Sequence, residues 1–129
     1  MTVALGRDMV PAFQLETFRT AASDGTLIWL LLALIIVAPA CEELLFRGFL
    51  FRGLVRDARD SLPGILLIAL LWSLLHIQYD WLGMATVFAI GVLFGYVRLY
   101  AESTLLVIVL HGLLNLESVG ETFFALGWL

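Results

Sequence analysis

Two adjacent glutamates, Glu42 and Glu43, lie inside an apolar run that is long enough to cross a lipid bilayer. Between Leu27 and Leu50 most of the other residues are Leu, Ile, Val, Ala and Phe. An ionisable side chain at that depth is costly, and two neighbouring carboxylates also repel each other. Such a pair is therefore expected to have a chemical role or a counter-charge.

Arg47 is the expected counter-charge for one of the two glutamates. It follows Glu43 by one helical turn, so the two side chains share a face of the helix and can form an ion pair. The pair would offset the cost of burying the second glutamate. Glu42 points about 100° away from Glu43 and has no expected partner within its own helix. Glu42 is thus the carboxylate that we expect to meet a water molecule or a substrate.

The two histidines of the chain lie in other apolar runs. His76 shares a helix face with Trp72, and His111 shares one with Asn115. A single membrane histidine is often only an interhelical hydrogen-bonding residue, and for His76 alone this interpretation is as good as a catalytic one. Counted from the turns near Asp60 and Ala101, the polar groups lie roughly 15–25 Å from the same membrane face. The sequence therefore predicts one cavity lined by Glu42, His76, His111 and Asn115.

Composition and patterning predict the elements that position these groups. The chain is 62% hydrophobic and 14% charged, far from the balance of a soluble domain. Four apolar runs are predicted to be helical: Thr26–Leu50, Leu62–Ile77, Trp81–Tyr100 and Ser103–Leu116. A spanning helix needs about 20 residues, so the first and third qualify and the other two are slightly short. We expect an all-α, polytopic transmembrane helix bundle of about four long helices, with short N- and C-terminal segments and no sheet.

The two ends of the chain carry weaker signals. Residues 1–25 are interpreted as a leader or an interfacial helix, and residues 26–129 as the membrane-embedded domain. A rough helical stripe supports the interfacial helix: Leu5, Met9, Phe13 and Phe18. In the apolar tail after Glu117, Gly120 and Gly127 are expected to interrupt the helix.

Charge placement predicts orientation and partners. The connection at residues 52–59 carries three arginines, and Arg98 lies at the next connection on the same side. The positive-inside rule predicts that this face is cytoplasmic. There is no basic patch, so nucleic acid is not an expected partner, whereas the lipid bilayer is. Cys41 is the only cysteine, which excludes an internal disulfide; beside Glu42 it could be a nucleophile, although a small helix-packing residue is the favoured interpretation.

Three motifs occur in an order and spacing that resemble one family of membrane proteins. Glu42–Gly48 (EELLFRG) matches EExxxR in its common form ending FRG, Trp72–His76 matches FxxxH with Trp for Phe, and His111–Asn115 matches HxxxN. Gly91–Gly95 is similar to the glycine-bearing helix that precedes the last motif. Over roughly residues 35–118 the chain thus resembles the CPBP family. This family comprises the type II CAAX prenyl endopeptidases and the bacteriocin-processing or immunity proteins, also called the Abi family.

The resemblance implies a metal-independent intramembrane glutamic endopeptidase without a cofactor. Its implied catalytic residues are Glu42, His76, His111 and Asn115, surrounded by Glu43, Arg47 and Trp72. Glu42 would be the general base that activates water, His76 would hold the water or the carboxylate, and the last two would donate to the oxyanion. The implied substrate is a membrane-associated peptide or protein, prenylated and of CAAX type in part of the family. The implied location is the plasma membrane of a prokaryote.

Several alternatives stay open. Zinc could bind to Glu42, His76 and His111 and supply the attacking water, although the chain has no HExxH motif. A membrane immunity or scaffold protein could keep the motifs without cleaving. A proton-coupled carrier is less favoured, because no inverted repeat is present. Relatives usually carry further membrane helices before the first motif, so the chain is a minimal member, a fragment or a homo-oligomer that completes the bundle.

Overall fold

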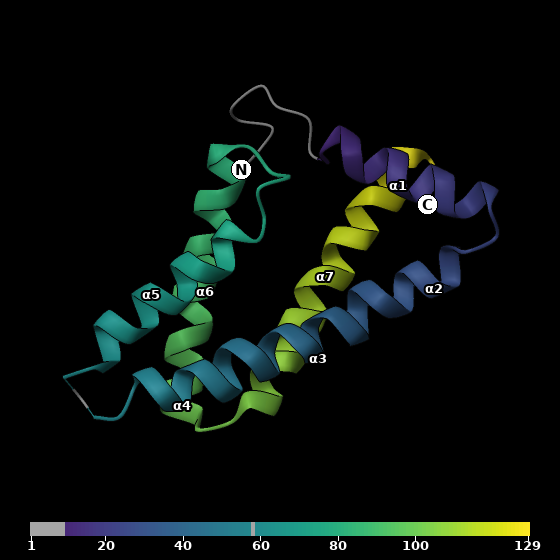
Figure 1. Cartoon of the computed structure of the whole chain (residues 1–129). Coiled ribbons are helices and arrows are strands. Elements are labelled where there is room, and N and C mark those ends of the chain that lie inside the picture. Colours follow the sequence, from purple (N-terminus) through teal and green to yellow (C-terminus); the bar gives the residue numbers. More distant parts are fainter. Residues whose placement is uncertain (1–9, 58) are drawn as a thin grey trace. The chain divides into compact units, whose positions relative to one another are not determined.

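The fold is helical throughout the part of the chain that the structure describes. The structure is a computed structural model that describes residues 10–57 and 59–129. Within these ranges every regular element is a helix, and no strand occurs (Figure 1). The prediction of an all-α fold is confirmed, as expected where backbone groups must be satisfied within a helix.

The first long helix is continuous from Leu27 to Leu54 and carries both glutamates. It consists of α2 (Leu27–Leu32), η2 (Ala33–Val37), α3 (Ala38–Glu43), η3 (Leu44–Leu50) and α4 (Phe51–Leu54). The segments η2 and η3 are π-helical, a conformation that interrupts the regular α-helical ladder and recurs at functional sites. The hydrophobic pattern did not predict these two segments.

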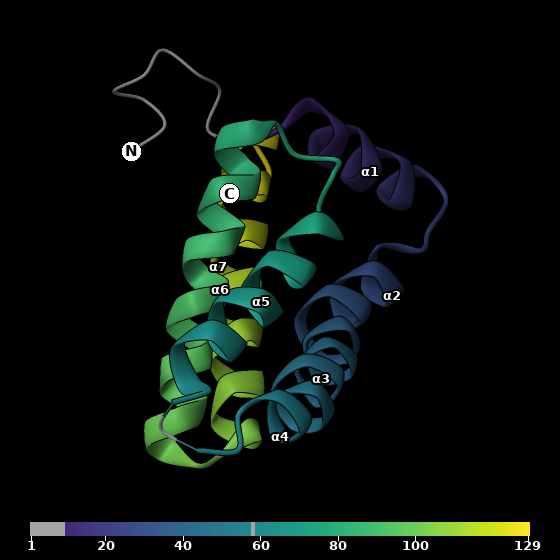
Figure 2. The same cartoon turned by 60° about the vertical axis from the view of Figure 1, so that its left-hand side comes forward.

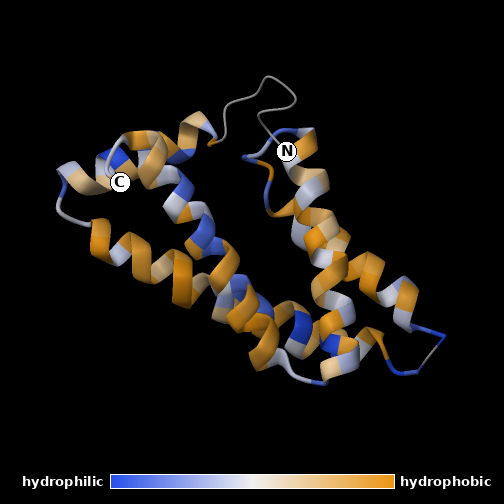
Figure 3. Cartoon of the chain, turned by 180° about the vertical axis from the view of Figure 1, so that it is seen from behind, coloured by the Kyte–Doolittle hydropathy of each residue, from blue (hydrophilic) through white to orange (hydrophobic). Residues whose placement is uncertain are grey.

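Four other helices complete the described chain: α1 (Ala12–Ser23), α5 (Ser61–Leu74), α6 (Trp81–Ala101) and α7 (Thr104–Leu126). The long helix Leu27–Leu54, α6 and α7 are long and apolar enough to span a membrane. Hydrophobic residues are distributed over most turns of these helices (Figure 3). α5 has 14 residues and falls below that length, as its apolar run indicated.

The last helix is longer than the sequence predicted. α7 passes through Gly120 and ends at Leu126, so the expected interruption at Gly120 is wrong. Gly127 follows with a φ of 71°, the left-handed conformation that ends many helices. The predicted short C-terminal segment is therefore mostly the last turns of α7.

The chain divides into two compact units. The central unit is Pro39–Leu110, and the terminal unit contains the described residues up to Ala38 together with His111–Leu129. The long first helix and α7 each contribute residues to both units.

The core of the central unit forms where α5 packs closely along α6. The two helices lie side by side in Figures 1 and 2. Two glycines of α6 permit the close approach: a Cβ atom on Gly95 would lie 2.6 Å from Ile65 Cγ2, and one on Gly91 would lie 3.0 Å from Ala69 Cβ. Small residues at this spacing let membrane helices pack backbone to backbone. The first helix and α7 add residues to the buried cluster, which contains Phe46, Phe51, Ile65, Ile68, Trp72, Phe94 and Val107.

Gly95→Ala should destabilise the central unit by about 1–3 kcal/mol, because the added methyl group overpacks the contact with Ile65. Gly120→Ala is the matched control, since a Cβ atom there meets nothing within 4 Å and alanine favours a helix. Thermal unfolding in detergent measures both. The double variant Gly95→Ala/Ile65→Ala should lose less stability than the sum of the single variants. Equal unfolding midpoints for Gly95→Ala and Gly120→Ala would contradict this packing.

In the terminal unit, α1 packs against the C-terminal half of α7. The rings of Phe18 and Phe123 meet edge to face at 6.0 Å. Gln14 Nε2 donates hydrogen bonds to Ser118 Oγ at 3.0 Å and to Thr122 Oγ1 at 2.7 Å. The N-terminal segment thus contains a helix, and its interfacial placement stays a prediction. Of the expected apolar stripe, Phe13 is exposed, Phe18 is buried, and Leu5 and Met9 lie outside the described residues.

Candidate active site

The two adjacent glutamates point to different partners. Glu43 Oε1 accepts a hydrogen bond from Arg47 Nη1 at 3.1 Å, and both side chains are 0% exposed. Glu42 is half-buried, and its Oε2 accepts a hydrogen bond from Trp72 Nε1 at 2.7 Å. The predicted Glu43–Arg47 ion pair is confirmed. Trp72 is a partner for Glu42 that the spacing of residues within one helix did not reveal.

The buried Arg47 guanidinium is compensated from several sides. Besides the bond to Glu43, Arg47 Nη2 donates to the carbonyl oxygen of Gly91 at 3.1 Å. The guanidinium carbon lies 4.6 Å from the centre of the Trp72 ring and 5.4 Å from that of Phe94. Cation–π contacts of this kind strengthen when water is excluded. Arg47 therefore joins the glutamate helix to both α5 and α6.

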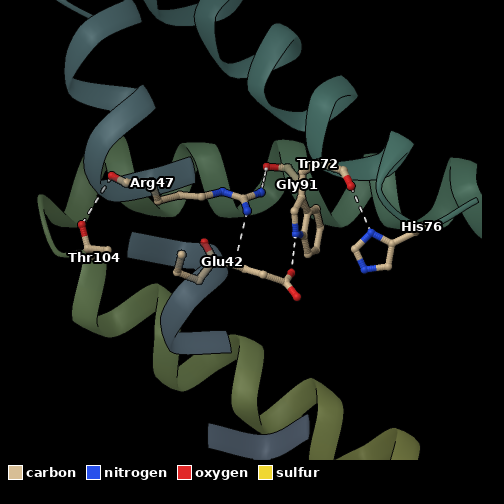
Figure 4. Close-up of polar contacts among 7 residues, drawn as sticks. Glu42, Arg47, Trp72, His76, Gly91 and Thr104 are labelled. Atoms are coloured by element: carbon tan, nitrogen blue, oxygen red, sulfur yellow. Dashed lines mark hydrogen bonds and ion pairs between the residues drawn. The ribbon is translucent and has the colours of Figure 1, made fainter. Parts of the chain in front are cut away.

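The main chain of Arg47 is held as well, within the π-helical segment η3. Arg98 Nε donates to the Arg47 carbonyl oxygen at 3.0 Å and to Thr104 Oγ1 at 3.1 Å. The Thr104 hydroxyl also donates to the same carbonyl at 3.4 Å. These contacts tie the end of α6 and the start of α7 to the motif, and Figure 4 shows the one from Thr104. Sequence reasoning treated Arg98 as a topology signal and missed this role, which no local spacing encodes.

His76 is oriented by the residue one turn before it. Its Nδ1 lies 3.0 Å from the carbonyl oxygen of Trp72. A carbonyl only accepts hydrogen bonds, so Nδ1 carries the hydrogen and, in the neutral ring, Nε2 is the acceptor. The imidazole meets the Trp72 ring edge to face at 5.1 Å and stacks on Tyr79 at 6.1 Å. Burial raises the pKa of the Tyr79 phenol above its ordinary value, so that ring stays neutral.

Glu42 and His76 both contact the same residue, Trp72. Figure 4 shows the Trp72 indole between the Arg47 guanidinium and the His76 ring, with the Glu42 carboxylate at the indole nitrogen. The indole contacts three motif residues: Glu42 and Arg47 of the first helix, and His76. His76 lies in the turn after α5, which ends at Leu74, so the predicted helical run to Ile77 is too long. This arrangement provides a half-buried carboxylate and an imidazole acceptor that contact the same tryptophan.

The other two expected site residues belong to the terminal unit. Asn115 Nδ2 donates to the carbonyl oxygen of Leu34, in the π-helical segment η2, at 2.7 Å. Gly112 permits this approach, because a Cβ atom there would lie 2.7 Å from the Ile35 carbonyl oxygen. Sequence reasoning missed the role of Gly112, although a glycine directly after the motif histidine was a visible signal. Glu42 and His76 belong to the central unit, and the cavity that they would share with His111 and Asn115 stays a prediction.

Comparison with known proteins identifies the family. The sequence model of the family "Type II CAAX prenyl endopeptidase Rce1-like" matches residues 24–116, which contain all three motifs. No curated protein and no solved structure matches the chain. The matched family is a family of membrane proteases, in agreement with the three apolar helices of spanning length. The chain therefore belongs to the Rce1-like family of type II CAAX prenyl endopeptidases, and the resemblance drawn from its motifs is confirmed.

Proposed function

We propose that the chain is an intramembrane endopeptidase that uses Glu42 to activate water for hydrolysis of a peptide bond. The observation that carries the proposal is that the two adjacent glutamates have different partners and different burial. Glu43 is bound to a buried arginine, whereas Glu42 is half-buried and lies at the same tryptophan as His76. A carboxylate has about four acceptor sites, so its bond to Trp72 leaves capacity for a water molecule.

The proposed reaction begins with water between Glu42 and His76. Glu42 takes a proton as the water oxygen attacks the carbonyl carbon of the scissile bond, and His76 Nε2 accepts the second water hydrogen in a hydrogen bond. Collapse of the tetrahedral intermediate breaks the C–N bond, and Glu42 returns its proton to the departing amine. The products are a carboxylic acid and an amine, and the carboxylate of Glu42 is regenerated.

His111 and Asn115 are proposed to stabilise the oxyanion. The amide of Asn115 has two hydrogens, and its bond to the Leu34 carbonyl uses one. The second can be donated to the developing oxyanion without any change in charge. Leu34 then fixes the orientation of the amide, a preorganisation that costs nothing at the moment of reaction.

The proposed substrate is a membrane-associated peptide or protein that ends in a prenylated CAAX sequence. The family supports a CAAX-type substrate, and a prenyl chain on the cysteine of such a sequence would anchor it in the lipid beside the site. The bilayer itself is the other proposed partner. Arg52, at the end of the first helix, and Arg56 and Arg59, in the connection after it, are exposed, which supports a cytoplasmic position for residues 52–59. The proposed membrane is the plasma membrane of a prokaryote.

Zinc hydrolysis is the runner-up mechanism. It would use Glu42, His76 and His111 as ligands and a metal-bound water as the nucleophile. We favour the metal-independent reaction because the second carboxylate of the motif, Glu43, is bound to Arg47, so that Glu42 is the one motif carboxylate left to act as a ligand.

The proposal is tested with the protein in liposomes and synthetic peptides that end in a CAAX sequence, with and without a farnesyl group on the cysteine. Mass spectrometry should detect cleavage of the farnesylated peptide and locate the broken bond. Activity should survive prior dialysis against a zinc chelator; loss on dialysis and recovery with zinc would favour the metal mechanism. Absence of cleavage of either peptide, with folded protein, would favour the immunity or scaffold alternative over this substrate class.

A further inference from the structure

We infer that Trp72 is the positioning residue of the proposed base: its indole N–H fixes the Glu42 carboxylate, and its ring couples that carboxylate to the Glu43–Arg47 ion pair. The inference rests on the proposed function, because it assigns the means by which Glu42 is held for reaction. It concerns the indole itself, because phenylalanine in its place would have no N–H group to donate.

The first step of the argument is the hydrogen bond itself. Trp72 Nε1 lies 2.7 Å from Glu42 Oε2, at the short end of the range for a bond from a neutral donor to a carboxylate. Indole N–H is only a donor, so the bond has one possible direction. A glutamate side chain has several rotatable bonds, and a fixed donor at one oxygen restricts how the other oxygen can be presented.

The second step is that the indole cannot turn away. Trp72 is 3% exposed and belongs to the buried cluster of the central unit. A Cβ atom on Gly91 would lie 3.1 Å from Trp72 Cε3, so the ring lies close against the α6 backbone. Phe94 lies 6.0 Å away between ring centres. A donor fixed by packing in this way preorganises the group that it binds.

The third step is the coupling to the ion pair. The Arg47 guanidinium lies 4.6 Å from the centre of the Trp72 ring, while the indole N–H is directed at Glu42. The ring of His76 contacts the same indole, and its Nδ1 contacts the Trp72 carbonyl oxygen. One side chain therefore touches the ion pair, the proposed base and the histidine that would share its water.

The kinetic test removes the N–H group and keeps the ring. Trp72 is replaced by phenylalanine and, by non-natural amino acid incorporation, by 3-benzothienylalanine, in which sulfur stands where the indole has N–H. Both variants should lower kcat about tenfold or more, the effect of losing one hydrogen bond to a charged group, with little change in KM. The unfolding midpoint of the benzothienyl variant should stay unchanged, because its ring has the same shape. Trp81→Phe is the matched control, because Trp81 is 77% exposed, and it should leave both constants unchanged. An unchanged kcat for the benzothienyl variant would overturn the inference.

A spectroscopic test reads the contact without relying on activity. With ¹⁵N-labelled tryptophan, the indole N–H resonance of Trp72 is assigned as the one missing from Trp72→Phe. It should shift in Glu42→Leu and stay in place in Glu117→Gln, which changes an exposed glutamate of α7. If the protein cleaves no peptide, the proposed function fails while this signal still decides whether Trp72 holds Glu42. If peptides are cleaved but the Trp72 resonance does not shift in Glu42→Leu, the positioning role is contradicted and the proposed function is not.

Discussion

Glu42→Gln should abolish peptide cleavage while the protein still folds and inserts into the membrane. Glutamine has the shape of glutamate, and its amide oxygen can still accept the hydrogen bond from Trp72 Nε1. It cannot take a proton from water, and general base catalysis contributes typically about 10²–10⁴-fold. The rate of cleavage of the farnesylated peptide should therefore fall by at least about 10²-fold. The unfolding midpoint should stay close to that of the unchanged protein.

Two further variants sharpen this experiment. Glu117→Gln removes the charge of an exposed glutamate outside the motifs and should keep full activity. Glu42→Asp keeps the proton acceptor but draws it back from the indole, so it should retain a small part of the activity. A Glu42→Gln protein that cleaves at the normal rate would exclude Glu42 as the base.

The helical fold could be predicted from sequence because lipid leaves the backbone few choices. The run Trp81–Tyr100 predicted α6 (Trp81–Ala101) to within one residue. The π-helical segments could not be predicted, because the first helix is apolar on nearly all sides and a local change of period leaves no polar stripe to read. The helix through Gly120 shows a related limit, since composition does not reveal which glycine takes a positive φ.

The parts of the site that depend on neighbours along the helix could also be predicted. The Glu43–Arg47 pair follows from their separation of one turn. The bonds from Trp72 to Glu42 and from Arg98 to the Arg47 carbonyl join residues far apart in the chain, and spacing alone cannot encode them. The position of Trp72 also depends on how closely α5 approaches α6, and Gly91 and Gly95 permit that close approach.

Glu43→Gln should damage folding far more than Glu42→Gln does. It leaves the Arg47 guanidinium buried without its counter-charge, and breaking a buried pair typically costs about 3–5 kcal/mol. Arg47→Met should be damaging too, because it strands Glu43 and removes the bond to the Gly91 carbonyl. Arg47→Lys should recover only part of the loss, since one ammonium group cannot reproduce both arms of the guanidinium. Thermal unfolding in detergent and the yield of folded protein measure each variant.

The double variant Glu43→Gln/Arg47→Met separates lost charge balance from lost packing. With both charges gone no ion is left unpaired, so its stability should exceed that expected from adding the two single losses. Strict additivity would mean that the pair contributes through shape and not through charge. Cleavage by the same set of proteins then tests the assignment of the two carboxylates. If a well-folded Glu43→Gln protein is inactive while Glu42→Gln remains active, Glu43 is the base and Glu42 the supporting residue.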